Sequence, residues 1–86
     1  FFVNLSYGLS NNEQVQCLQQ FLKNQGSAIY PEGLVTGNFL SLTQAAVVRF
    51  QEAYAAEILV PLELQEGTGF VGPLTRKKMN ELIGVP

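Results

Sequence analysis

Three segments of the chain place apolar residues at helical spacing. In the first, the apolar positions recur at intervals of three and four residues: Val15, Leu18 and Leu22. Ser10 and Glu13 fit a capping box, in which the hydroxyl accepts a hydrogen bond from a helix amide and the carboxylate reaches back. Gly26 suits a left-handed helix terminator. The pattern predicts a helix over about residues 11–25, with its apolar stripe facing inward.

The second and third segments have start signals of their own. Ser41 and Gln44 fit another capping box, and Pro73 suits the first helical position, where its missing amide hydrogen costs nothing. Gly84 is placed to end the third helix. The expected apolar faces are Ala46, Val47, Phe50 and Tyr54 on the second helix, and Leu74, Met79, Leu82 and Ile83 on the third.

The segments between these helices are predicted to be loops. Residues 58–69 contain a loosely alternating apolar run, but Pro61 cannot donate a ladder hydrogen bond, so at most a short edge strand forms there. The opening residues 1–5 are expected to lie on the helices as a short extended piece. We therefore predict an all-α fold, a compact three-helix bundle with long loops.

Two of the helix starts belong to a sequence repeat. The stretches TGNFLSLTQAAVVRF and TGFVGPLTRKKMNEL align without gaps, and both open with Thr-Gly and continue to Leu-Thr. The repeat predicts two equivalent corners, each a turn followed by a helix. We expect Phe39 and Val71 to point inward from these corners, and Thr43 and Thr75 to hold the loops by hydrogen bonds.

Length and composition limit the chain to one modest core. Its 86 residues suit a single domain, residues 1–86, and 47% hydrophobic residues lie well outside the disordered range. Only 14% of the residues are charged, against roughly 25% in an average domain, so we expect Gln and Asn to complete the surface. With five basic and seven acidic residues, the chain has no attraction for phosphate backbones, and no nucleic-acid partner is expected.

The inventory of reactive groups is poor. The chain has no histidine, and its one cysteine, Cys17, permits no internal disulfide and no thiolate metal cluster. The glutamates are scattered and suggest no acid/base couple. We therefore predict no catalysis, no metal and no cofactor. Cys17 itself is interpreted as a half-buried small hydrophobe, with linkage of two exported chains as the alternative.

Three glycines match the spacing of a dinucleotide-binding motif, but the surrounding sequence does not. Gly67, Gly69 and Gly72 spell G-x-G-x-x-G between an apolar run and a helix. That site requires a full βαβ unit and an acidic residue about 20 positions later for the ribose, and neither follows Gly72. The repeated corner explains these glycines better.

A resemblance to a known family covers essentially the whole chain. It is carried by three segments in order: LSYG…VQCLQQFL…G, TGNFLSLTQAAVVRFQ and GTGFVGPLTRKKMNEL. They resemble the peptidoglycan-binding-domain-like family of small three-helix modules. Members of that family have a Leu-Gln pair in the first helix, two glycine turns, and an Ala-Val pair followed by Phe-Gln. The matching positions are Leu18-Gln19, Ala46-Val47 and Phe50-Gln51.

The chain departs from the family pattern in three ways. Leu40 and Ser41 replace the usual Gly-Pro of the first copy, which Gly72 and Pro73 retain in the second. No acidic residue precedes the first turn glycine, and the link after Phe50 is longer than in compact members. These changes bear on ligand binding more than on the fold.

The resemblance implies a non-catalytic module that binds peptidoglycan, through its glycan or its stem peptide, and targets or anchors an attached protein to the bacterial envelope. A binder of that polymer needs amides, an aromatic face and a few cations. The candidate ligand-binding residues are Tyr30, Thr36, Asn38, Gln44, Arg49 and Arg76. Each has a structural alternative: Tyr30 as a cap on the core, Asn38 as a turn residue, and the arginines as solvated helix residues.

The resemblance also implies an extracytoplasmic location, in the cell envelope or secreted. No apolar run approaches the roughly 20 residues that span a bilayer, and the N-terminal stretch lacks the basic start of a signal peptide. We expect any export signal to lie outside this chain.

A structural role is the alternative function. Two segments are more apolar than loops of a monomer need to be: Phe1, Phe2 and Val3 at the start, and the run from Ile58 to Leu64. They predict self-association in a surface or filamentous assembly, by strand addition or apolar packing.

Overall fold

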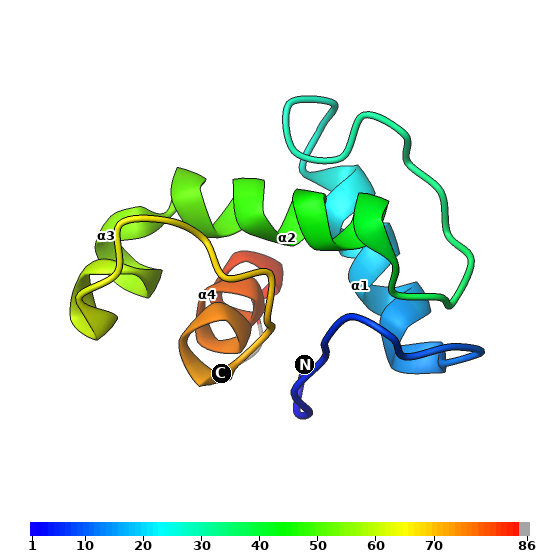
Figure 1. Ribbon diagram of the computed structural model, residues 1–86, viewed down its shortest axis with the longest axis horizontal. Coiled ribbons are helices and arrows are strands. Elements are labelled where there is room, and N and C mark those ends of the chain that lie inside the picture. Colours follow the sequence, from blue (N-terminus) through cyan, green and yellow to red (C-terminus); the bar gives the residue numbers. More distant parts are fainter. Residues whose placement is uncertain (85–86) are drawn as a thin grey trace.

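Three longer helices dominate the computed structural model, which describes residues 1–84 (Figure 1). They are α1 (Glu13–Asn24), α2 (Ser41–Ala53) and α4 (Pro73–Ile83). A four-residue helix, α3 (Ala55–Ile58), and a 3-10 helix, η1 (Val60–Leu62), follow α2. The described residues contain no strand, only an isolated antiparallel bridge between Leu5 and Val71. The predicted all-α class, with three main helices and two turn–helix corners, is confirmed.

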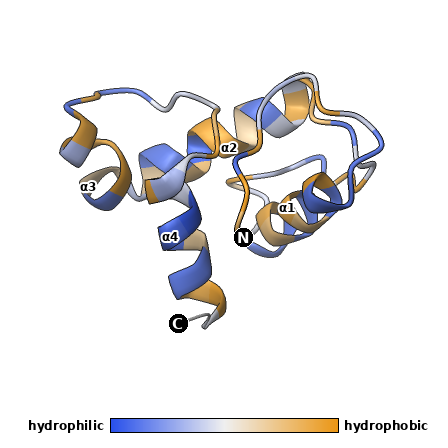
Figure 2. Cartoon of the chain, turned by 90° about the horizontal axis from the view of Figure 1, so that it is seen from below, coloured by the Kyte–Doolittle hydropathy of each residue, from blue (hydrophilic) through white to orange (hydrophobic). Residues whose placement is uncertain are grey.

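The helix α2 lies across the molecule, with α1 near its first residues and α3 and α4 near its end (Figure 1). Figure 2 shows apolar and polar residues alternating along the helices, as expected for helices that bury one face. Val47 and Phe50 of α2 are fully buried together with Leu18 of α1 and Met79 of α4. The Phe21 ring makes an edge-to-face contact with Phe50 at 5.4 Å between centroids. One core therefore joins the three longer helices.

The first two helix starts differ from the predicted capping boxes. The cap of α1 is Asn12, not Ser10: its Oδ1 accepts hydrogen bonds from the amides of Gln14 at 2.8 Å and Val15 at 3.1 Å. The prediction is wrong because the backbone turns at Asn11, which has a φ of 48°, so the helix begins after it. Ser41 does not cap α2 either, since it is itself the first helical residue, after Leu40.

The remaining helix boundaries agree with the predictions. Pro73 is the first residue of α4, where it lacks only an amide hydrogen that would have had no partner within the helix. Gly84 ends α4 with a φ of 86°, and Gly26 follows α1 with a φ of 109°, both in the left-handed region that favours glycine.

The N-terminal segment ties the two corners together. Leu5 exchanges two backbone hydrogen bonds with Val71, at 3.2 and 2.8 Å. Phe39 donates its amide to Leu9 and accepts from Gly8, both at 2.8 Å. Phe39 and Val71 are fully buried, as predicted for the apolar residue of each corner. The expected extended piece is therefore confirmed at Leu5.

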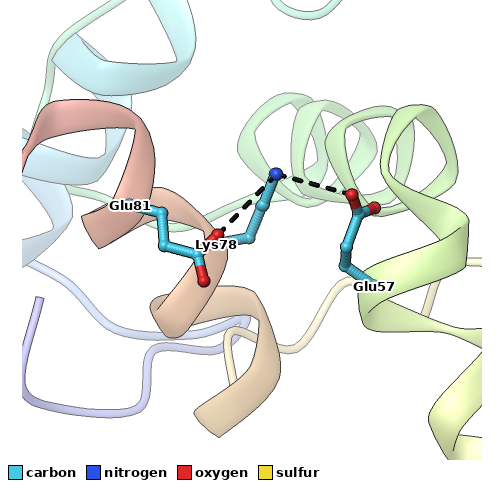
Figure 3. A network of polar contacts seen from close by, with 3 residues as sticks. All are labelled: Glu57, Lys78 and Glu81. Atoms are coloured by element: carbon cyan, nitrogen blue, oxygen red, sulfur yellow. Dashed lines mark ion pairs between the residues drawn. The ribbon is translucent and has the colours of Figure 1, made fainter.

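The insert that follows α2, residues 55–67, begins with helical turns. The prediction of a loop over residues 58–69 is therefore wrong for Ile58 and Val60–Leu62, whereas residues 63–69 lie outside any helix or strand, as predicted. Ile58 and Leu59 are each 1% exposed, because α3 turns them into the space beside α2 and α4. Pro61 sits inside η1, where its fixed φ is accommodated in a tight turn. A single charged side chain joins this insert to α4: Lys78 contacts Glu57 at 3.5 Å and Glu81 at 3.8 Å (Figure 3). Its ammonium also lies 4.9 Å from the ring centre of Tyr54.

Candidate functional site

A buried glutamine holds the first corner. Gln19 of α1 is 1% exposed, and its Oε1 accepts hydrogen bonds from the amides of Thr36 at 2.8 Å and Gly37 at 2.9 Å. Its Nε2 donates to the Asn38 carbonyl at 3.0 Å and to the Thr43 hydroxyl at 2.9 Å. One side chain therefore joins the turn, the start of α2 and α1.

The second corner is built in the same way. Gln51 of α2 is 2% exposed and accepts from the amides of Thr68 at 2.8 Å and Gly69 at 3.0 Å. It donates to the Phe70 carbonyl at 2.8 Å and to the Thr75 hydroxyl at 3.1 Å. The sequence separations of 17, 18, 19 and 24 residues between the bonded groups are the same in both corners.

The two glutamine clamps, defined as Gln19 and Gln51 with their partners, account for the repeated turn and helix start. The predicted role of Thr43 and Thr75 is confirmed, although their hydroxyls act through a glutamine and not on the loop directly. Sequence reasoning matched both glutamines to a family pattern but gave them no role. The signal was present, since a Gln precedes each Thr-Gly pair by the same 17 residues.

Each corner borders a pocket beside the first turn of the following helix. The first-corner pocket has a volume of about 260 Å³ and is lined by Gln19, Tyr30, Leu34, Thr36, Asn38, Leu40, Ser41, Leu42 and Thr43. The second-corner pocket has a volume of about 360 Å³ and is lined by Gln51, Ile58, Leu59, Leu62, Leu64, Thr68, Phe70, Gly72, Pro73, Leu74 and Thr75. Several lining residues occupy equivalent places, which makes the two pockets counterparts.

Their chemistry differs in the side chains that do not bond to a clamp glutamine. Asn38 and Ser41 of the first-corner pocket correspond to Phe70 and Pro73 of the second. The first pocket therefore offers an amide and a hydroxyl among its leucines, whereas the second is bordered by apolar side chains. Within residues 1–84 no side chain caps the start of α2, so amides of its first turn remain available beside the first-corner pocket.

Three of the predicted site residues meet at the first-corner pocket. Thr36 and Asn38 are exposed there, and the Asn38 Oδ1 accepts a hydrogen bond from the Asn11 amide at 3.0 Å. Tyr30 is only 3% exposed, and its hydroxyl donates to the Leu34 carbonyl. Its ring belongs to the core cluster, so most of the Tyr30 side chain caps the core, as in the structural alternative.

The other three predicted residues lie outside this pocket. Arg49 is exposed and donates from Nη1 to the Ile29 carbonyl at 3.1 Å, next to Tyr30 in the chain. Gln44 is half-buried against the second corner, where a Cβ atom added at Gly69 would lie 2.7 Å from its Cγ. Arg76 is half-buried in α4, and its Nε has no hydrogen-bond partner within residues 1–84.

Cys17 is exposed on α1, so its interpretation as a half-buried hydrophobe is wrong. Residues on either side of it, Val15 and Leu18, face the core, and the helical rotation turns Cys17 outward between them.

A helical scaffold whose corners hold open pockets is typical of small binding domains. In the comparisons with known proteins, the model of the family described as "Putative peptidoglycan binding domain" matches residues 11–57, more than half of the chain. The chain belongs to this family. The matched residues include α1, the first corner and α2, whereas the second corner and α4 lie outside them. Neither the curated proteins nor the solved structures gave a match.

The described helices were also compared with the dimensions of a bilayer. None of them within residues 1–84 has the length and apolar character that a membrane span requires.

Proposed function

We propose that residues 1–86 act as one non-catalytic module that binds peptidoglycan at the first-corner pocket and thereby anchors an attached protein to the bacterial envelope. The observation that carries the proposal is the family match, because its residues 11–57 contain every residue that lines this pocket. An extracytoplasmic location follows from the ligand.

The chemistry of the pocket supports this choice. Peptidoglycan has a neutral amino-sugar backbone with peptide stems that carry carboxylates. Asn38 and Ser41 supply a carboxamide and a hydroxyl for sugar hydroxyls and N-acetyl groups, while Leu40 and Leu42, 53% and 44% exposed, supply apolar contacts. A stem carboxylate is accommodated at the open first turn of α2, where backbone amides and the helix dipole favour an anion.

The other predicted contacts are assigned by whether they line this pocket and by what they bond to. We propose Thr36 as a direct contact and Tyr30 as the residue that positions the loop over the pocket, through its bond to the Leu34 carbonyl. Arg49, bound to the Ile29 carbonyl beside Tyr30 in the chain, is proposed as a cation for a stem carboxylate. Gln44 contacts the second corner from α2 and Arg76 lies in α4, so in this proposal they contribute to the scaffold.

Catalysis by this chain is not part of the proposal. The chain contains no histidine, so the exposed Cys17 thiol has no imidazole to activate it.

The test is a pelleting assay with purified sacculi that compares two exposed first-turn residues. Ser41→Glu places a carboxylate where the ligand's carboxylate would bind, and it suits the N-terminus of a helix, so folding is preserved. We expect it to weaken pelleting about tenfold, the loss of one charge-assisted interaction. Pro73→Glu makes the same change at the equivalent position of α4 and should leave pelleting unchanged. Equal pelleting by both variants, or no pelleting by the wild-type chain, would contradict the proposal.

Self-association remains the second candidate, and one observation favours it. Phe2 is 82% exposed, and Val60 and Leu62 of the insert are 64% and 55% exposed. Ile58 and Leu59 do not contribute to such a contact, because both are buried, and Phe1 packs on Phe21 at 5.8 Å between centroids. A subunit of an assembly would form oligomers that grow with concentration in size-exclusion chromatography and would not pellet with sacculi.

A further inference from the structure

Apart from Gln51, the residues that line the second-corner pocket lie outside the range that the family model matches, and the pocket has a composition of its own. Its rim consists of Leu62, Leu64 and Phe70, which are 55%, 37% and 44% exposed. Ile58 of α3 and Leu59, which follows it, form its buried side. The first-corner pocket has both polar and apolar lining residues, whereas the insert makes the second-corner pocket mainly apolar.

The polar atoms in this pocket are already bonded to one another. The Gln51 amide joins Thr68, Gly69, Phe70 and Thr75, as described above, which occupies the hydrogen-bonding groups of the clamp. A group that enters the pocket consequently gains by burying apolar surface and not by new hydrogen bonds. The volume of about 360 Å³ is ample for one large side chain, since a cavity of about 150 Å³ holds benzene.

The charges of the insert side of the pocket are acidic, whereas Arg76, Lys77 and Lys78 follow the last lining residue, Thr75, in α4. Between Gln51 and Thr75 there are four glutamates and neither a lysine nor an arginine. Glu57 is paired with Lys78, and Glu52 accepts a hydrogen bond from the Gly67 amide. Glu63 and Glu66 are exposed and form no ion pair within the described chain, and Glu63 lies directly between the rim residues Leu62 and Leu64. At Leu62 and Leu64 the rim is thus complementary to a basic group beside an apolar one.

We propose that the second-corner pocket is a docking site for a protein segment that carries a large aromatic or aliphatic side chain next to lysine or arginine. The apolar side chain fills the pocket against Leu62, Leu64 and Phe70, and the basic side chain lies by Glu63 and Glu66. This site goes beyond the peptidoglycan-binding role, because it has a separate pocket and a different class of ligand. It would allow the module to hold a partner protein while the first corner holds the cell wall.

The absence of tryptophan from the chain gives a direct assay. The probe is the peptide acetyl-Ala-Trp-Lys-Lys-Ala-amide, and the charge-reversed control peptide is acetyl-Ala-Trp-Glu-Glu-Ala-amide. The 86-residue chain is titrated into each peptide while the tryptophan emission is followed. With the lysine peptide we expect a blue shift of the tryptophan emission that saturates. The glutamate peptide should bind about tenfold more weakly, because its two carboxylates are repelled by Glu63 and Glu66, whereas the two lysines are attracted. The preference should decrease as salt is raised.

Variants identify the site. Leu62→Ser and Phe70→Ser alter exposed rim residues and should each weaken binding of the lysine peptide about fivefold or more, by loss of apolar burial. Leu42→Ser, at the rim of the first-corner pocket, is the matched control and should bind like the wild-type chain. Glu63→Gln combined with Glu66→Gln should remove most of the preference for lysine. Thermal unfolding of each variant checks that the fold is retained.

The possible contrary results are distinct. Equal binding of the two peptides, or no binding of either, would overturn the proposed partner chemistry. Self-association that Leu62→Ser abolishes would instead assign the pocket to a second copy of the chain. Pelleting with sacculi is measured separately with the same variants, so loss of wall binding and loss of peptide binding are distinguishable.

Discussion

Replacing Gln51 by alanine is expected to lower the free energy of unfolding by about 3 kcal/mol, because the buried Gly69 amide and the Phe70 carbonyl lose their partner. Gln19→Ala should cost a similar amount, since the Gly37 amide is buried in the same way. Unfolding in urea, followed by circular dichroism, measures both. A domain of this size has little stability to lose, so either variant should be partly unfolded well below the transition of the wild-type chain.

Gln20→Ala is the matched control for this pair. Gln20 neighbours Gln19 on α1, but it is exposed and its amide bonds only to Asn24 at 3.0 Å. Its replacement should change stability by no more than about 0.5 kcal/mol. If Gln19→Ala and Gln20→Ala were equally mild, the clamps would not be what holds the corners.

Gly69→Ala is expected to destabilise the protein by about 2–4 kcal/mol for two reasons that add. Gly69 has a φ of 78°, which disfavours any residue with a Cβ, and that Cβ would lie 2.7 Å from the Cγ of Gln44. Thermal unfolding gives the change. The second corner packs directly on the first turn of α2, so the residue has no free space in which to relax.

Two further variants separate strain from close contact. Gly8 has a φ of 102° with nothing within 4 Å of an added Cβ, so Gly8→Ala should cost only the backbone strain, about 1–2 kcal/mol. Gln44→Ala in the background of Gly69→Ala should restore part of the lost stability, because it removes the atom that the new methyl meets. Equal costs for Gly8→Ala and Gly69→Ala, with no rescue, would show that Gln44 does not press on this corner.

Most helix positions were predictable because their signals are local, although the expected apolar face of α4 is wrong at Leu82 and Ile83, which are 42% and 52% exposed. The spacing of Val15, Leu18 and Leu22 marks the buried face of α1, and all three are fully buried. Pro73 and Gly84 bound α4 as expected, since proline and glycine restrict the backbone whatever surrounds them.

The start of α1 depended on a distant contact and was missed. Ser10, Asn11 and Asn12 are consecutive residues, and each is a good capping type. The choice falls on Asn12 because its amide donates to the carbonyl of Gly37 at 3.1 Å, across the first corner. Sequence spacing holds no information on that bond.

The helical turns at Ile58 and Val60–Leu62 were missed for a related reason. The run from Ile58 to Leu64 alternates too loosely to favour any element and includes Pro61. Its helical turns are stabilised by burial of Ile58 and Leu59 beside α4, and that neighbour is supplied only by the folded chain. The second-corner pocket, which the insert helps to form, was unpredictable for the same reason.

The glutamine clamps were overlooked because glutamine is usually a surface residue. A chain with few charges was expected to use its glutamines on the surface, yet Gln19 and Gln51 are among its most buried side chains. Of the six predicted site residues, the structure brings Tyr30, Thr36 and Asn38 to one pocket. Gln44 and Arg76 proved to lie elsewhere because nothing in one sequence gives the rotation of a helix about its neighbour.

Amide chemical shifts, followed by NMR while soluble peptidoglycan fragments are added to the labelled chain, test the central claim most directly. The two corners share a construction, so the measurement compares like with like. We expect saturable shifts at residues 30–43 of the first corner and none at the equivalent residues 62–75 of the second. Shifts centred on the second corner, or none at any concentration, would contradict the assignment of cell-wall binding to the first-corner pocket.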